Sequence, residues 1–182
     1  MSVEPAPFYS AHSALRWAYG IAGLGVYERP VTSHKEEHQR DPRRTPRFPG
    51  LSPMEKHAQA AWIIRAAERC ASLTPTERDL VSARFLVPNS PEAESAKQAA
   101  IRQVGLQVAG YYSYGREFVE DTVRRFAGEA HQTNAEWAAA LGKSKRAVRD
   151  SRQTIMNRLR NTMTSALEKL EGAMEERGYV AA

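Results

Sequence analysis

The stretch AEWAAALGKSKRAVRDSRQTI, residues 135–155, joins an alanine-rich apolar turn to a basic segment through a single glycine. Gly142 stands where a tight turn between two helices needs a positive φ, a conformation that glycine adopts without a steric penalty. Ala138 is the small residue expected at the helix crossing, and Ser144 can cap the second helix. The apolar residues spaced to face inward are Trp137, Leu141 and Val148. The pattern predicts a helix-turn-helix within residues 133–160.

Positive charge is concentrated in the second half of this motif. Residues 143–160 hold seven lysines and arginines against one acid, Asp150, so their formal charge of +6 exceeds the +5 of the whole chain. A helix in the major groove can pair arginine with guanine edges and glutamine with adenine edges. The predicted DNA-contacting residues are Lys143, Ser144, Lys145, Arg146, Arg149, Asp150, Arg152 and Gln153. The alternative is a solvated basic face on an ordinary helical hairpin.

Helix signals dominate the rest of the chain. Serine or threonine followed by proline and then glutamate is typical of a helix start, and it recurs near residues 52, 74 and 90. No run of alternating β-branched residues competes with this pattern. Helices are predicted over residues 10–22, 53–71, 75–86, 91–108 and 116–127, and from residues 134 and 144 onward. The expected fold is an all-α helical bundle that contains the helix-turn-helix and a long C-terminal helix.

Composition along the chain suggests three parts. Residues 1–28 form an N-terminal helix, residues 29–51 a proline- and arginine-rich linker, and residues 52–182 the helical DNA-binding body. Proline-rich segments with several like charges fold poorly on their own. The arginines of this linker, which could contact phosphates or simply remain solvated, are Arg40, Arg43, Arg44 and Arg47.

Two further features are open to more than one interpretation. Three tyrosines could stack on single-stranded RNA or plug a helix junction, and packing is favoured for large aromatic residues. They are Tyr111, Tyr112 and Tyr114. An apolar stripe in the C-terminal helix could pack on the body, contact a partner or self-associate. It consists of Met163, Leu167, Leu170 and Met174.

Several functional classes find no support in the sequence. The HKEEH stretch at residues 34–38 has the spacing of a zinc peptidase motif, but it lies beside the linker and lacks an apolar helical face. No catalytic set of side chains, metal site or cofactor loop can be placed, so no enzyme is expected. No apolar run is long enough to span a membrane, and the first ten residues do not resemble a secretion signal. The single cysteine, Cys70, fits a buried thiol in the cytoplasm.

Two segments resemble region 4 of bacterial sigma factors. LTPTERDLVSARFL, residues 73–86, resembles the first half, with its Leu-x-Pro-x-Glu-Arg opening. Residues 133–160 resemble the second half. The matching positions there are Thr133, Glu136, Leu141, Gly142, Ser144, Val148, Arg149, Leu159 and Arg160. Residues 87–132 separate the two halves, and no candidate for the aromatic-rich region that melts the −10 element is present.

A small basic all-α chain with these features is similar to phage Q-type transcription antiterminators and their prophage-derived relatives. The resemblance implies binding to a promoter-proximal DNA element and loading onto RNA polymerase holoenzyme, through sigma region 4 or the β flap. It also implies proximity to nascent RNA. Two other classes fit the same motif: a repressor or activator that binds as a dimer, and a ring-forming small terminase subunit of a phage.

Overall fold

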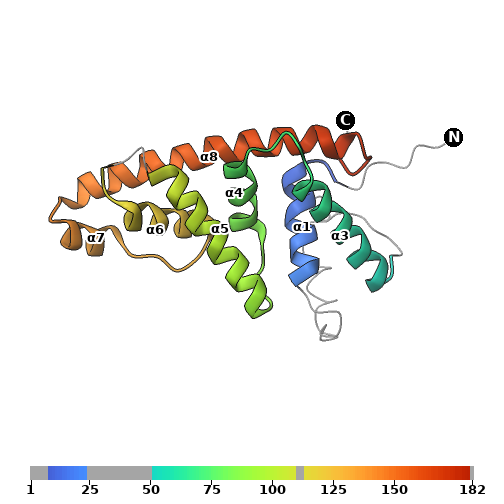
Figure 1. The fold of residues 1–182 in the computed structure, drawn as a ribbon, viewed down its shortest axis with the longest axis horizontal. Coiled ribbons are helices and arrows are strands. Elements are labelled where there is room, and N and C mark those ends of the chain that lie inside the picture. The colour runs from blue at the N-terminus through green and yellow to red at the C-terminus, as the bar shows by residue number, and fades with distance from the viewer. Residues whose placement is uncertain (1–7, 24–50, 110–112, 181–182) are drawn as a thin grey trace, which may run out of the picture. The chain divides into compact units, whose positions relative to one another are not determined.

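The computed structural model describes residues 8–23, 51–109 and 113–180, and it is all-helical there. The helices are α1 (Ala11–Gly23), α3 (Pro53–Glu68), α4 (Pro75–Phe85), α5 (Pro91–Ala109), α6 (Arg116–Ala127), α7 (Asn134–Leu141) and α8 (Lys145–Glu175) (Figure 1). This confirms the predicted all-α class. The described residues contain one isolated β-bridge, between Phe8 and Val180, and no helix in them is both long and apolar enough to cross a membrane.

The predicted helix starts are confirmed because the side chains that cap them are in place. At α3, α4 and α7 the capping residue accepts a hydrogen bond from the backbone three residues on, and a glutamate at that position bonds back. These reciprocal pairs satisfy backbone N–H groups that a helix start leaves unpaired. The pairs are Ser52 with Glu55, Thr74 with Glu77, and Thr133 with Glu136.

The described chain divides into two compact units, each considered by itself. Of the described residues, the first contains 8–23, 51–70 and 170–180, and the second contains 71–109 and 113–169. The division therefore falls after α3, whereas the sequence suggested a body beginning at residue 52. The reason is that α3 buries Ala60, Ile63 and Ala67, and its packing partner in the first unit is α1. The arginines of the expected linker and the HKEEH stretch lie outside the described residues.

The second unit is built from α4, α5, α6, α7 and the part of α8 up to residue 169. Helix α5 packs against both α4 and α6. Fully buried residues of this unit include Leu80 of α4, Ile101 and Val104 of α5, Phe118 and Val119 of α6, and Ile155 and Leu159 of α8. The segment between the two sigma-like pieces, residues 87–132, thus supplies α5 and α6 to the core. It is therefore part of the fold that holds α7 and α8 in place.

A buried carboxylate ties the beginning of α4 to α8. Glu77 accepts hydrogen bonds from Lys169 Nζ at 2.7 and 2.8 Å, from Ser165 Oγ at 2.8 Å and from the backbone N–H of Thr74 at 2.8 Å. Burial raises the pKa of this carboxyl, but the hydrogen bonds from Lys169, Thr74 and Ser165 outweigh burial and lower the pKa to about 2. Glu77 is therefore ionised at neutral pH and holds α4 in place.

Candidate nucleic-acid interface

The turn between α7 and α8 has the backbone geometry that the sequence predicts. Gly142 has φ 60° and ψ 32°, the left-handed conformation, and ends α7. Lys143 N–H donates to Ala138 O at 3.0 Å and Gly142 N–H donates to Ala139 O at 3.4 Å, which is the Schellman pattern. Ser144 then caps α8, because its Oγ accepts from Ala147 N–H at 3.2 Å. The two helices are joined by a turn of three residues.

The inward side of the motif is held by a buried polar network as well as by apolar contacts. Trp137 Nε1 donates to Asp121 Oδ2 at 2.8 Å, and Arg152 Nη2 donates to the same oxygen at 2.6 Å. The other oxygen, Asp121 Oδ1, accepts from Gln132 N–H at 2.8 Å. Asp121 therefore joins α6, the loop before α7, α7 itself and α8 through one carboxylate.

Aromatic rings complete this network. The Phe118 ring lies edge-on to the Trp137 ring, with centroids 5.4 Å apart and an interplanar angle of 83°. The Arg152 guanidinium carbon lies 5.4 Å from the centroid of Phe118. Edge-to-face pairs and cations over ring faces are both favourable contacts of the aromatic quadrupole. Val148 is fully buried and Trp137 is buried, whereas Leu141 is only half-buried, so the predicted apolar cluster is centred on the first two.

The predicted DNA contact of Arg152 is wrong, because this side chain is buried in the second unit. The residue is only 2% exposed, and its Nη1 donates to Gln132 O at 3.0 Å and to Asn134 Oδ1 at 2.7 Å. Burial lowers the pKa of the guanidinium and Asp121 opposes that shift, and arginine remains protonated in proteins. With its side chain turned into the unit, Arg152 cannot reach a phosphate. The sequence pattern missed this because Asp121, its partner, lies 31 residues away in another helix.

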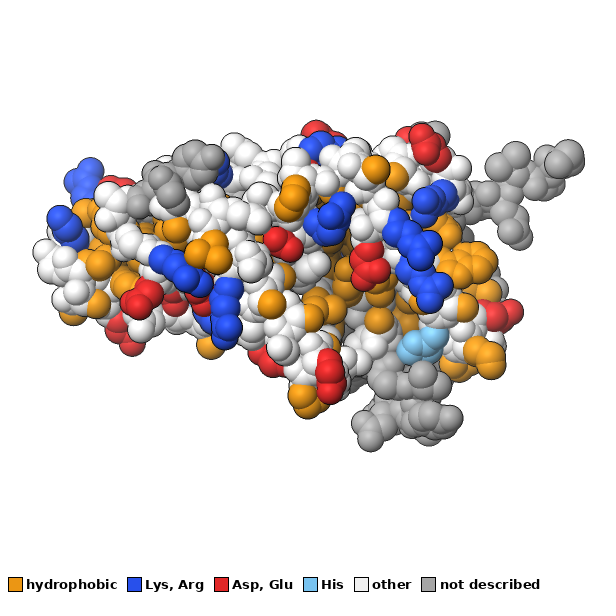
Figure 2. Space-filling view, viewed as in Figure 1, with side chains coloured by type: hydrophobic (Ala, Val, Ile, Leu, Met, Phe, Trp, Pro, Cys, Tyr) orange, Lys and Arg blue, Asp and Glu red, His pale blue; other side chains and the backbone are white. Residues whose placement is uncertain are grey.

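The remaining predicted residues lie on the outside. Lys143, Ser144, Lys145 and Gln153 are exposed, and the side chains of Arg146 and Arg149 are 85% and 66% exposed. Asn134, Lys145, Arg146 and Arg149 line a hollow of about 330 Å³. We refer to Lys143, Lys145, Arg146 and Arg149 as the recognition face. Figure 2 shows lysine and arginine side chains at the end of the second unit where α7 meets α8.

Asp150 and Gln153 lie beside the recognition face, and each has a side-chain partner of its own. Asp150 Oδ2 lies 3.8 Å from Arg146 Nε, and its Oδ1 lies 3.4 Å from Arg149 Nε. Such exposed pairs contribute little to stability, so both arginines can exchange Asp150 for another acceptor. The Gln153 amide donates to Asn157 Oδ1 at 2.8 Å and would have to release it to read a base.

Electrostatics at the start of α8 favour an anionic ligand. The first turn of α8 holds no acid, and Lys145 and Arg146 occupy it. The N-terminus of a helix already carries about half a positive charge from the backbone dipoles, so cations there repel it. The chain therefore concentrates positive potential where it slightly opposes helix stability. A polyanion bound at this end would neutralise it.

Tyr114 is the one residue of the tyrosine cluster that the structure describes. It is half-buried, and its ring centroid lies 5.3 Å from that of Phe118. For this residue the packing interpretation fits. Tyr111 and Tyr112 lie outside the described residues.

Comparison with known proteins gives no match to a protein-family model and no significant match to a curated protein. The interface is therefore interpreted from its own residues and geometry.

Proposed function

We propose that this chain binds double-stranded DNA through α7 and α8 and acts as a transcription antiterminator of the Q type. The observation that carries the DNA-binding part is the recognition face: four exposed basic residues in the turn after Gly142 and in the first two turns of α8, three of which line a hollow beside Asn134. A rigid turn, a buried inner side and a basic outer side are what a recognition helix requires.

The antiterminator role rests on the resemblance of residues 73–86 and 133–160 to the two halves of sigma region 4. A module that holds promoter DNA without a segment to melt it cannot begin transcription. It would act by joining a polymerase that is already at the promoter, and it would then let that polymerase pass terminators.

The arrangement of the second unit indicates where polymerase contact is best sought. Helix α4 is largely internal, with Leu80, Val81 and Phe85 buried. Helix α5 presents Leu106, which is 44% exposed and is the exposed large apolar side chain of this helix. We therefore place the proposed polymerase contact on the outer side of α5, within residues 87–132.

Terminator readthrough in purified transcription tests this function. Templates would carry a promoter, the DNA element selected by the protein from a random library, and a downstream terminator. The expected result is readthrough that needs both the protein and its element, with little effect when the protein is added after polymerase has left the promoter. A template with a scrambled element is the matched control.

The same assay separates the other two candidates. Tight binding to the element with no change in readthrough on any template would leave a repressor or activator. A measured mass many times the chain's 20.3 kDa would instead indicate a ring such as a small terminase subunit forms. Arg149→Ala should reduce readthrough in step with its loss of affinity for the element, whereas Leu106→Ser should reduce readthrough and leave DNA binding unchanged.

A further inference from the structure

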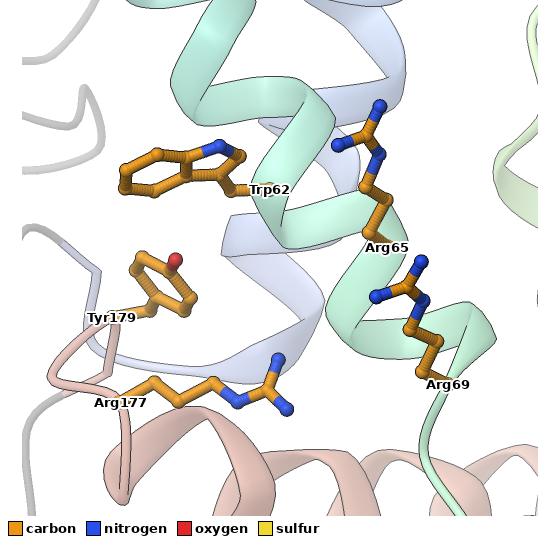
Figure 3. Close-up of a pocket in the computed structure, with 5 residues that line it drawn as sticks. All are labelled: Trp62, Arg65, Arg69, Arg177 and Tyr179. Carbon is orange, nitrogen blue, oxygen red and sulfur yellow. The ribbon is translucent and has the colours of Figure 1, made fainter.

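A second group of arginine and aromatic side chains lies in the first unit, which contains none of the helix-turn-helix residues. Trp62 and Arg65 project from α3, Arg69 caps the end of that helix, and Arg177 and Tyr179 follow the end of α8 (Figure 3). The spacing of three and four residues places the first three on one face of α3. Together these five residues line a hollow of about 260 Å³. We refer to them as the Trp62 site.

The backbone after α8 positions the C-terminal half of this site. Gly178 has φ 72°, and Tyr179 N–H donates to Met174 O at 2.9 Å while Gly178 N–H donates to Glu175 O at 2.9 Å. This is again a Schellman turn, which reverses the chain in a defined geometry. Phe8 N–H then donates to Tyr179 O at 3.2 Å and fixes the turn to the segment before α1. Arg177 and Tyr179 are thus held in place by backbone hydrogen bonds.

The tryptophan of the Trp62 site is exposed, and its arginines form no salt bridge within the described residues. Trp62 is 61% exposed. Across residues 8–23, 51–109 and 113–180, no salt bridge engages Arg65, Arg69 or Arg177, and the neighbouring acids Glu68 and Glu176 do not pair with them. Figure 3 shows the Trp62 and Tyr179 rings on one side of the hollow and the three guanidinium groups toward the other. A flat apolar surface therefore adjoins three positive charges.

We propose that the Trp62 site binds a short stretch of single-stranded nucleic acid, with bases stacked on Trp62 and Tyr179 and phosphates held by the three arginines. Aromatic faces accept any unpaired base, and arginine adds both phosphate and cation–π contacts. In a duplex the bases are already stacked, so their faces are unavailable to an indole. An acidic peptide would use the charges but leave the exposed indole without a role.

The volume of the hollow also favours a polymer over a small molecule as the ligand. It is smaller than the roughly 300–1,000 Å³ of pockets that enclose whole small molecules. A polymer needs no enclosure, because one residue can occupy the hollow while its neighbours continue across the surface. This inference goes beyond the proposed function, and it stands or falls independently of duplex binding by the recognition face.

The test uses the full chain with Arg146→Ala and Arg149→Ala, which weaken nucleic-acid binding by the recognition face and serve as the parent for all further variants. Binding of fluorescent oligo-U and oligo-dT would be followed by anisotropy over a salt series. Trp62→Ala should weaken binding at least about fivefold, the lower end for removal of one stacked base, and Trp62→Phe should retain most of the affinity. Arg65→Gln with Arg69→Gln should flatten the salt dependence by about 0.7 for each phosphate that is no longer neutralised.

Arg16→Gln is the matched control, because Arg16 is an exposed arginine of α1 in the same unit. Tighter binding of oligo-U would identify RNA as the ligand of the Trp62 site, and tighter binding of oligo-dT would identify single-stranded DNA. Either result supports the proposal. The proposal is overturned if Trp62→Ala binds like the parent, or if Arg16→Gln has the same effect as the α3 pair. Equal displacement of the oligonucleotide by polyglutamate or by a duplex of the same length would also overturn it.

Discussion

Asp121 and Arg152 form a buried ion pair, with Oδ2 and Nη2 separated by 2.6 Å, that connects α6 to α8. Both side chains are almost fully enclosed, and the carboxylate is completed by Trp137 and by the backbone of Gln132. A pair of this kind is costly to desolvate, and removal of one partner leaves the other charge buried without compensation. Here it ties α6 to the helix whose first two turns carry the exposed basic residues Lys145, Arg146 and Arg149.

Removal of the acid should destabilise the second unit strongly. Asp121→Ala leaves the Arg152 guanidinium buried without a counter-charge, and we expect a loss of about 3–5 kcal/mol in the free energy of unfolding. Urea denaturation followed by circular dichroism measures this. Asp150→Ala, which removes an exposed acid from the same region, should change stability by less than about 0.5 kcal/mol. Similar losses for both variants would show that the buried pair has no special role.

Truncation of the tryptophan tests the aromatic part of the network. Trp137→Ala should cost about 3–5 kcal/mol, because it removes a buried aromatic side chain and a donor to Asp121. Trp137→Phe keeps most of the packing and loses the hydrogen bond to a charged acceptor, so a smaller loss of about 1.5–3 kcal/mol is expected. Thermal melting ranks the two, and a wild-type-like melting curve for the alanine variant would contradict the assigned cluster.

Duplex binding should separate base-reading from phosphate-contacting residues. Arg149→Ala should weaken binding to the selected element by about 1–3 kcal/mol and relax preference at one base pair. Lys145→Ala should weaken all duplexes alike and reduce the salt slope by about 0.9. Titrations against the element and a scrambled duplex distinguish these effects. Unchanged affinity and unchanged preference for Arg149→Ala would mean that α8 does not read DNA.

The basic residues at the start of α8 should lower the stability of the folded state and raise its affinity for duplex DNA. Lys145→Glu places an acid at the positive end of the helix dipole, and we expect the folded state to gain about 0.3–1 kcal/mol. The same change should sharply reduce duplex affinity, because it reverses the charge on the recognition face. Arg160→Glu, about four turns further along α8, is the control and should bring no such gain. Loss of both stability and binding in Lys145→Glu would indicate a structural role for the lysine.

Acid should weaken the second unit through Glu77. The folded pKa of about 2 lies below the ordinary value of 4.5, so the stabilisation is present above pH 4.5 and disappears as the pH falls toward 2. The shift corresponds to roughly 2–4 kcal/mol at neutral pH. Chemical denaturation between pH 7 and pH 2.5 measures it. Glu77→Gln should be less stable at pH 7 and should lose less stability than the wild type over this interval.

Local sequence patterns determined the helices and the turn of this protein. A capping hydroxyl and a glutamate three residues later, with a proline after the cap at α3 and α4, act within a single helical turn, and for that reason the starts of α3, α4 and α7 were predictable. Gly142 was predictable for the same reason, because the left-handed backbone at this position excludes most other residues. The exposure of Arg146 and Arg149 followed from helical periodicity.

Tertiary structure alone decided which basic residues remain outside and which lie within. Arg152 shares a basic segment with Arg149, and only the packing of α6 against the turn brings Asp121 within 2.6 Å of it. The Trp62 site likewise joins α3 to residues more than 100 positions later in the chain. Ion pairs and side-chain clusters depend on distances in space, and periodicity along one helix contains no information about a partner supplied by another.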